Sequence, residues 1–431
     1  MIENIVNRLN DKHILILGFG REGKSTLRFV QKFVSYASVA VADRNDAALQ
    51  PVRELGLPCF GGDDYLNAVN NFDIVIKTPG ISLLGMQISQ NVYVTSQTDL
   101  FLSAFHSQTI GISGTKGKST TTSLIYHLLK SSGRKAILTG NIGIPCFDVV
   151  EHVDNLSVVV YELSAHQLEY VHQSPRVGVL LNIFEEHLDH FGTFERYKQA
   201  KLNLLRYMGD DDYAVVHDSL LDETLQLGVN SVVYSNLDFD GDVDWSALPL
   251  FGEHNMMNVR AALVACSKYG VDYRELVPYL YDFQPLEHRL ERVGEYGGVT
   301  FVNDSISTIP QAAISACKAL GRVDFLLLGG FDRGIDYAPL VSFLKDNRVS
   351  HLLFTGKAGL RMMQLLQEAH VDTKMVVYGD MDEAFAYIGA NACEGDVCLL
   401  SPAASSYDRY KNFEERGSVF KKLAKCYQSA K

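Results

Sequence analysis

The stretch Thr109-Ile-Gly-Ile-Ser-Gly-Thr-Lys-Gly-Lys-Ser-Thr-Thr-Thr122 decides the fold of this chain. Ile110 and Ile112 are typical of the end of a buried strand, and the glycines that follow break that strand. Beyond the glycines, apolar residues recur at helical spacing: Leu124, Ile125, Leu128 and Leu129. The stretch therefore predicts a strand, a glycine-rich loop and a helix in succession.

This loop carries the residue types that bind nucleotide phosphates. Backbone N–H groups around Gly117 and the positive end of the following helix would face the phosphates. Lys118 would reach the β- and γ-phosphates, and the Ser119 hydroxyl would bind Mg²⁺. One position departs from the strict phosphate-loop pattern, because Ile112 stands where that pattern has its first glycine. The alternative interpretation is a glycine-rich turn without chemical function.

Composition narrows the class of protein. A chain of 431 residues with 47% hydrophobic content is long enough for about two to four domains with large cores. The formal net charge of −12 argues against a nucleic-acid partner. The 7 cysteines are scattered without CxxC spacing, which indicates free thiols in a reducing cytoplasm. Residues 1–12 lack the apolar core of a signal peptide, and no run approaches the ~20 apolar residues of a membrane span, so we expect a cytoplasmic protein.

A second glycine loop follows a strand near the N-terminus. The apolar run His13–Leu17 leads into Gly18-Phe-Gly-Arg-Glu-Gly23, a GxGxxG pattern. The next strand, Ala37–Val41, is followed by Asp43, an acidic residue where Rossmann-like domains bind a ribose or base edge. A third strand, Phe72–Lys77, ends in another glycine loop. A tight turn without a ligand is the alternative. NAD is the first ligand to consider, but a dehydrogenase does not need a second phosphate loop, so the pattern indicates another nucleotide.

Two further strands are predicted to end beside the phosphate loop. Ser157–Tyr161 is followed by Glu162, whose carboxylate would suit Mg²⁺. Val177–Leu181 is followed by His187, and Lys201 lies in the predicted helix beyond it. For Glu162 and His187 the alternatives are a solvated carboxylate and an ordinary surface histidine.

The C-terminal part again alternates strands with helices. Its strands and the polar loops that end them are Val299–Val302 with Asn303–Ser305, Asp324–Leu328 with Gly329–Arg333, and Val397–Leu400 with Ser401. The whole chain therefore predicts an α/β protein of three domains. These are an N-terminal Rossmann-like domain at 1–95, a central P-loop ATPase-like parallel sheet at 96–284, and a C-terminal doubly wound Rossmann-like domain at 285–431.

Motifs spread over the chain strengthen this interpretation: GTKGKSTT at Gly114, TGNIG at Thr139, ELSAHQLE at Glu162, HLD at His187 with Lys201, GEHNMMN at Gly252, LEHRLE at Leu286, NDS at Asn303, and SPAASSYDRYKNFEERG at Ser401. In combination they resemble the Mur ligase family, the ATP-dependent ligases that build the peptide stem of peptidoglycan. The resemblance implies ligation of D-glutamate to UDP-N-acetylmuramoyl-L-alanine through an acyl phosphate, with release of ADP and phosphate. We expect a monomer.

The resemblance also implies a nucleotide and metal site. The implied ATP contacts are Gly114, Thr115, Lys116, Gly117, Lys118, Ser119, Thr120, Asn255, Asn258, Arg289 and Asp304, with His254 also facing the adenine. Ser119 and Glu162 would hold one Mg²⁺, and His187 and Lys201 a second. In the family this lysine is carbamylated, which turns an ammonium that repels a cation into a carboxylate-like ligand. Lys118, Glu162, His187 and Lys201 would then form the catalytic set.

Two further groups of contacts are implied. The UDP-muramoyl substrate would meet Gly20, Arg21, Asp43, Arg44, Thr78, Pro79, Gly80, Asn141, Ser164 and Gln167, with the loop continuing to Ser82. The incoming glutamate would meet Arg333, Ser406, Tyr407 and Phe413.

Several positions depart from the usual family pattern. Ile306 stands where a lysine is common, Arg333 replaces another lysine, and Tyr407 replaces a leucine. His166 replaces an aromatic residue, and Glu186 replaces an aspartate. These departures leave L-glutamate open as the acceptor. A nucleotide-binding dehydrogenase or regulator is a third hypothesis, but it leaves the loop at Gly114 without a purpose.

Overall fold

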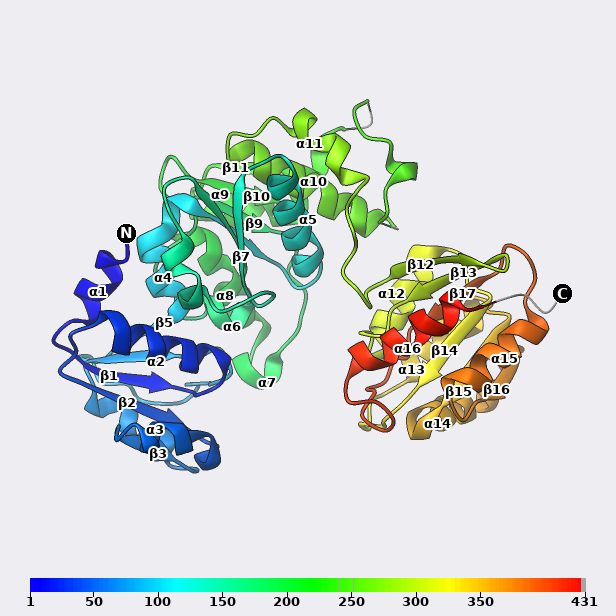
Figure 1. The fold of residues 1–431 in the computed structure, drawn as a ribbon, viewed down its shortest axis with the longest axis horizontal. Helices are drawn as coiled ribbons and strands as arrows, with labels where there is room; N and C mark the ends of the chain where they lie inside the picture. Colours follow the sequence, from blue (N-terminus) through cyan, green and yellow to red (C-terminus); the bar gives the residue numbers. More distant parts are fainter. Residues whose placement is uncertain (240, 251, 428–431) are drawn as a thin grey trace. The chain divides into compact units, whose positions relative to one another are not determined.

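The computed structural model describes residues 1–239, 241–250 and 252–427. The chain divides into two compact units (Figure 1), which we call the first and second unit. The first comprises Met1–Ser246 with Met257–Asp282, and the second comprises Ala247–Met256 with Phe283–Lys431. All seven cysteines are free thiols. No helix within the described part of the chain is long and apolar enough to cross a membrane.

The first sheet of the first unit is parallel and has the strand order β3-β2-β1-β4-β5. Its strands are β1 His13–Leu17, β2 Ser38–Asp43, β3 Cys59–Gly61, β4 Ile74–Lys77 and β5 Tyr93–Ser96. Its helices are α1 Glu3–Leu9, α2 Arg21–Phe33 and α3 Gln50–Glu54. The central strands β1 and β4 are buried almost throughout, as expected for a parallel sheet covered on both faces.

The central sheet is also parallel, with the order β11-β10-β9-β6-β8-β7. Its strands are β6 Thr109–Ser113, β7 Lys135–Gly140, β8 Ser157–Glu162, β9 Val177–Leu180, β10 Tyr213–Val216 and β11 Ser231–Val233. The helices of this region are α4 Gln97–Phe105, α5 Lys118–Ser131, α6 Ala165–Leu168, α7 Leu188–Phe191, α8 Phe194–Arg206, α9 Leu221–Leu227, α10 Glu253–Lys268 and α11 Tyr273–Leu280. The predicted succession of strand, glycine loop and helix around residues 109–122 is therefore present as β6, loop and α5.

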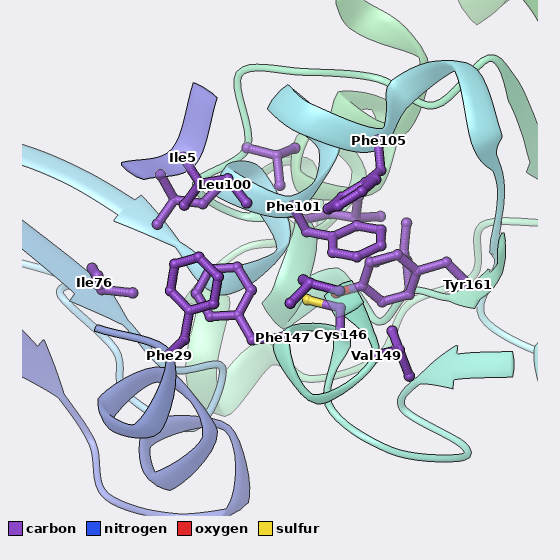
Figure 2. Packing of buried hydrophobic residues seen from close by; sticks show 14 of the residues in the cluster. Ile5, Phe29, Ile76, Leu100, Phe101, Phe105, Cys146, Phe147, Val149 and Tyr161 are labelled. Atoms are coloured by element: carbon purple, nitrogen blue, oxygen red, sulfur yellow. The ribbon is translucent and has the colours of Figure 1, made fainter. Parts of the chain in front are cut away.

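One apolar core joins the first and central sheets. It includes Phe29 of α2, Phe101 of α4 and Tyr161 of β8 (Figure 2). Phe29 stacks on Phe147 with ring centroids 4.2 Å apart, and Phe101 meets Tyr161 edge-on at 5.6 Å. Aromatic pairs of this kind add about 0.5–1.5 kcal/mol beyond the area they bury. Because the core is continuous, the two sheets form a single unit.

The third sheet lies in the second unit and has the order β12-β13-β17-β14-β15-β16. Its strands are β12 Glu291–Tyr296, β13 Val299–Asn303, β14 Phe325–Gly329, β15 His351–Thr355, β16 Lys374–Val377 and β17 Val397–Leu400. Its helices are α12 Pro310–Leu320, α13 Ala338–Asp346, α14 Gly356–Glu368, α15 Met381–Asn391 and α16 Phe413–Lys425. All pairs are parallel except β12 with β13. The predicted α/β class, with three largely parallel sheets, is confirmed.

Two glycines of the GxGxxG loop give opposite expectations for alanine. A Cβ on Gly23 would lie 2.0 Å from the Gly18 carbonyl oxygen, whereas a Cβ on Gly20 would meet no atom within 4 Å. Gly23→Ala should therefore lower the free energy of unfolding by about 1–3 kcal/mol, although alanine is normally the better residue in a helix. Gly20→Ala should change it by less than about 0.5 kcal/mol. Urea unfolding of both variants tests this, and equal stabilities would contradict it.

Candidate functional site

The phosphate loop lies between two strands that also end in polar residues. β6 pairs with β8 on one side, with Ile112 opposite Glu162, and with β9 on the other, with Ser113 opposite Leu180. Parallel strands bring their carboxyl ends to the same edge of the sheet, where ligands of open α/β sheets bind. Glu162 and the loop after Leu180 therefore flank the glycine loop.

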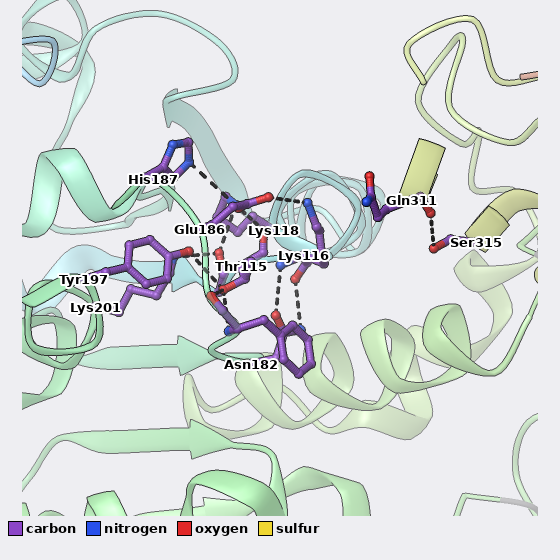
Figure 3. A network of polar contacts seen from close by, with 12 residues as sticks. Thr115, Lys116, Lys118, Asn182, Glu186, His187, Tyr197, Lys201, Gln311 and Ser315 are labelled. Atoms are coloured by element: carbon purple, nitrogen blue, oxygen red, sulfur yellow. Dashed lines mark hydrogen bonds and ion pairs between the residues drawn. The ribbon is translucent and has the colours of Figure 1, made fainter. Parts of the chain in front are cut away.

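The conformation of the loop requires its glycines. Gly114 and Gly117 have φ values of 153° and 86°, which side-chain-bearing residues rarely adopt. A Cβ on Gly117, the residue before α5, would lie 2.5 Å from Asn258 Oδ1. Asn182, just beyond β9, fixes the loop from the other side. Its carbonyl accepts from the Thr115 N–H at 2.9 Å, and its side-chain oxygen accepts from the Lys116 N–H at 2.9 Å (Figure 3).

Three lysines converge on this loop. Lys118 Nζ donates to the carbonyls of Gly114 and Thr115 at 2.9 and 3.0 Å. Lys201 Nζ, from α8, donates to the same Gly114 carbonyl at 2.8 Å. Lys116 forms an ion pair with Glu186 (Figure 3). The loop therefore has a concentration of positive charge in a chain that is acidic overall.

Lys201 is the most unusual of these lysines because it is buried. Burial holds the pKa of Lys201 well below that of an exposed lysine, and the nearby Lys118 ammonium lowers it further. A larger fraction of Lys201 is thus an uncharged amine, which is the nucleophilic form. Its Nζ also lies 5.0 Å from the centre of the Tyr197 ring, which is fixed by a 2.9 Å hydrogen bond to Thr115.

Glu162 has the strongest indication of a cation ligand. It is completely buried, and its Oε1 accepts from Asn141 Nδ2 at 2.7 Å. Its Oε2 is also buried and has no hydrogen-bond partner among the described residues. A buried carboxylate oxygen without a partner is costly, and a cation would remove that cost. The residues therefore fit a Mg²⁺ ion held by Glu162, the last residue of β8, with Ser119, the second residue of α5.

The second predicted metal site, formed by His187 and Lys201, has fewer anionic groups than the first. His187 has a φ of 57° and precedes α7, with its Nε2 3.8 Å from Glu186 Oε2. Within residues 1–239, 241–250 and 252–427, no group of three or more His, Cys, Asp and Glu side chains is arranged to hold a metal ion. His187 and Lys201 fit a cation only if Lys201 becomes anionic.

Asn255 and Asn258 are predicted to contact the adenine, and Asn258 lies against α5, the helix that follows the phosphate loop. Both asparagines are buried on α10, and Asn258 Oδ1 accepts from Thr121 Oγ1 of α5 at 3.2 Å. Thr120 is also buried on α5. His254 and Asn255 belong to the part of α10 that clusters with the second unit.

Part of the set predicted to bind the UDP-muramoyl substrate lies at the first sheet's carboxyl edge. Asp43, at the end of β2, accepts from the N–H of Phe19 at 2.6 Å and so orders the glycine loop. The loop after β4 lies beside it, since the Thr78 N–H donates to Leu17 O at 2.8 Å. Pro79 is partly exposed, whereas Gly20, Gly80 and Arg44 are exposed, and Arg44 pairs with Asp63.

Arg21 and Gln167 connect this edge to the central sheet. Arg21 donates to the carbonyls of Gly140 and Gly143 at 3.4 and 3.3 Å, beside Asn141. Gln167 forms a capping box with Ser164 at the start of α6. Its Nε2 also donates to Glu22 Oε1 at 2.8 Å. The structure thus brings Arg21, Asn141, Ser164 and Gln167 together around the junction of the two sheets.

The second unit holds the remaining predicted residues. Asp304, after β13, accepts from Ser401 Oγ at 2.7 Å and from the Leu290 N–H at 3.1 Å, which places it beside Arg289. Burial raises the pKa of Asp304 to about 6. Ser406 is buried, Tyr407 and Arg333 are exposed, and Phe413 starts α16. The Phe413 carbonyl accepts from Ser305 Oγ at 2.8 Å.

Arg416 is a buried residue at this edge that sequence reasoning did not assign. Its guanidinium donates to the carbonyls of Ser305 and Ala404 at 2.8 and 3.1 Å. It thereby joins the segment after β13 to the segment that carries Ser406. The only signal in the sequence was its position within the motif that begins at Ser401.

Comparison with known proteins identifies the family of this chain. Residues 112–240 match the Mur ligase middle domain, and residues 288–404 match the Mur ligase glutamate ligase domain. A relative from Desulfitobacterium hafniense (strain Y51), named UDP-N-acetylmuramoylalanine–D-glutamate ligase, is 32% identical over 451 residues and covers 97% of this chain and 98% of its own length. A relative of the same name from Geobacillus kaustophilus (strain HTA426) is 32% identical, covering 95% and 96%. The chain belongs to the Mur ligase family.

Solved Mur ligases have the same fold. The MurF ligase of Acinetobacter baumannii matches with a TM-score of 0.60 and 17% identity over 90% of this chain and 91% of its own. The UDP-N-acetylmuramate–alanine ligase of Thermotoga maritima matches with a TM-score of 0.57 and 18% identity, covering 96% and 99%. As a Mur ligase, the chain is an ATP-dependent ligase.

Glu162→Gln tests the cation site of this Mur ligase. The amide keeps the shape of the side chain but removes its charge. In wild-type protein, the Tm with ADP and MgCl₂ should be higher than the Tm with ADP alone, and in Glu162→Gln this difference should be lost. Saturation at about 100 times Kd stabilises a protein by about 2.7 kcal/mol, which a thermal-shift measurement resolves. Glu195→Gln, an exposed change on α8, should keep the full rise. An undiminished rise in Glu162→Gln would refute the assignment.

Proposed function

We propose that this Mur ligase joins D-glutamate to UDP-N-acetylmuramoyl-L-alanine and converts ATP to ADP and phosphate in the same reaction. The observation that carries the proposal is the similarity to ligases of that name over 97% of the chain, which includes the first sheet as well as the ATP-binding part. The substrates are a nucleotide-linked precursor, an amino acid and ATP, so we place the reaction in the cytoplasm.

The proposed division of labour follows the three sheets. Residues 1–95 bind the uridine diphosphate through the loops at Gly20 and Thr78. Residues 96–284 bind the ATP phosphates through the loop at Gly114, and residues 285–431 bind the amino acid and complete the nucleotide site. This division is supported by the position of each loop at the carboxyl edge of its sheet, where open α/β sheets bind ligands.

Two Mg²⁺ ions complete the proposed site, one held by Ser119 and Glu162 and one by His187 and Lys201. Bound there, they would neutralise phosphate oxygens. The Glu162 oxygen that has no partner among the described residues supports the first position. For the second, Lys201 must be anionic. Its depressed pKa favours the neutral amine, which can attack CO₂, form an N–C bond and lose one proton to give a carbamate.

The reaction needs no covalent bond to the protein. The alanyl carboxylate attacks the γ-phosphorus of ATP, the bond to the ADP oxygen breaks, and an acyl phosphate forms. The glutamate amine then attacks the acyl carbon, loses a proton, and phosphate leaves. Lys118 and the N–H groups of the loop hold the phosphates in line, and Arg333 supplies a planar guanidinium for a glutamate carboxylate.

Phosphate release tests the function directly. With ATP, Mg²⁺ and UDP-N-acetylmuramoyl-L-alanine, we expect release with D-glutamate and not with L-glutamate. Release with L-glutamate alone would contradict the stereochemical assignment and give Ile306 and Tyr407 a role in specificity. No release with either isomer would refute the proposed reaction.

Lys201→Ala tests the second cation position. Removal of an anionic ligand should lower kcat by at least about 100-fold, the scale found when one charge-stabilising group is deleted. Lys198→Ala lies on the same helix and removes only a partly buried pair with Glu223, so it should retain activity. Circular dichroism of both variants checks folding. Near-normal turnover of a folded Lys201→Ala enzyme would contradict the role.

A further inference from the structure

A buried ion pair joins the first and central sheets. It lies beside the loop 78–82 and the loop at His187, both of which are predicted to bind ligands. Lys77, the last residue of β4, has a side chain only 2% exposed, and its Nζ lies 2.9 Å from Glu169 Oε2. Glu169, directly after α6, is 20% exposed. Desolvation lowers the pKa of Lys77, while the Glu169 carboxylate opposes that shift. A buried pair of this kind is poor evidence of stabilisation, because apolar residues of similar size often serve as well.

Glu169 has a second partner on α7. The same Oε2 atom lies 3.0 Å from His190 Nε2, whose side chain is 9% exposed. One carboxylate oxygen therefore binds a residue of the first sheet and a residue of the loop after β9. This single oxygen atom therefore links the two residues directly.

Each partner of Glu169 is next to a proposed ligand loop. Lys77 directly precedes the loop 78–82. His190 belongs to the short helix α7, whose preceding residue is His187, and the N–H of His190 donates to the His187 carbonyl at 3.1 Å. The two loops also meet directly, since Ser82 Oγ donates to the His190 carbonyl at 3.2 Å.

His166 of α6 fills the space between the histidines. Its ring lies 4.4 Å from that of His190 and 4.7 Å from that of His187, both edge-on. Burial lowers the pKa of His166 to about 4, so it packs as an uncharged ring. The side chains of α6 and α7 thus form a continuous set of contacts from Glu169 to His187.

We propose that Glu169 is a positioning residue that couples the UDP-substrate loop 78–82 to the cation loop at His187. By binding Lys77 and His190 together, it holds the two loops in one arrangement, so that occupancy of either loop favours binding at the other. The inference rests on the proposed function, because that function assigns the ligands of both loops. It goes beyond that function because Glu169, Lys77 and His190 would touch neither the reacting atoms nor the cation.

The test measures coupling at equilibrium. Calorimetry gives the Kd of UDP-N-acetylmuramoyl-L-alanine with and without MgCl₂ for the wild type and for Glu169→Gln, which keeps the shape of the side chain. We expect Mg²⁺ to tighten wild-type binding about tenfold, within the usual range of coupling between sites. In Glu169→Gln that factor should fall to about one, while the KM for glutamate is unchanged.

Two variants make the result specific. Glu151→Gln breaks the exposed pair of Glu151 with Lys32, which also joins the first sheet's α2 to the central region, and should leave the coupling intact. The double variant Lys77→Met, Glu169→Gln removes both charges of the pair and so leaves no buried lysine without a partner. We expect this variant to stay folded and to lose the coupling.

The outcomes separate the two proposals. If both Glu169 variants show the same coupling as the wild type, the positioning role is overturned and the proposed function is unaffected. A lower folded fraction with unchanged coupling would show that Glu169 is only structural, and also overturns it. Absence of UDP-substrate binding by the wild type refutes the proposed function, and with it this inference.

Discussion

The contact between α2 and the segment before β8 is the constraint on which the first unit depends. Phe29 and Phe147 stack there, and the same core continues through Phe101 to Tyr161. Two parallel sheets that could otherwise have been independent are thereby held as one body. The glycine loop at Gly18 and the phosphate loop at Gly114 are consequently fixed relative to each other before any ligand contributes. Orientation of this kind is a large part of what an enzyme without a covalent intermediate can supply.

The charged groups around the phosphate loop differ in their partners and in their burial. Lys118 donates to carbonyls and Lys116 pairs with a carboxylate, whereas burial lowers the pKa of Lys201 well below that of an exposed lysine. Glu162 lies at the opposite side of the loop, and one of its oxygens has no hydrogen-bond partner in the part of the chain that the structure describes. Cationic and anionic groups therefore flank the same glycine loop, an arrangement suited to a polyphosphate that travels with divalent ions.

Local patterns in the sequence were sufficient for the phosphate loop and for several of the buried strands, although β10 and β15 were not predicted. The apolar lead-in at Ile110, the glycines and the helical spacing after Ser119 predicted β6, its loop and α5 correctly. Strand β12 was missed because Glu291–Tyr296 is a half-buried edge strand with a register shift near Gly294 and no continuous apolar run. The partners of buried polar groups were also missed. Lys77 and Glu169 are separated by 92 residues, and Glu22 and Gln167 by 145, so no local spacing relates them.

Lys118 and Lys201 donate hydrogen bonds to carbonyls of the loop itself, so an anion that binds these lysines must compete with those carbonyls. A lone small anion would have to displace these internal acceptors while gaining few contacts of its own. A triphosphate reaches several N–H donors and cations at once, so its combined contacts outweigh the same internal bonds, as in any multivalent exchange. The lysines of this loop therefore give up internal hydrogen bonds when they bind phosphate, which lowers the net gain for an anion that makes few contacts.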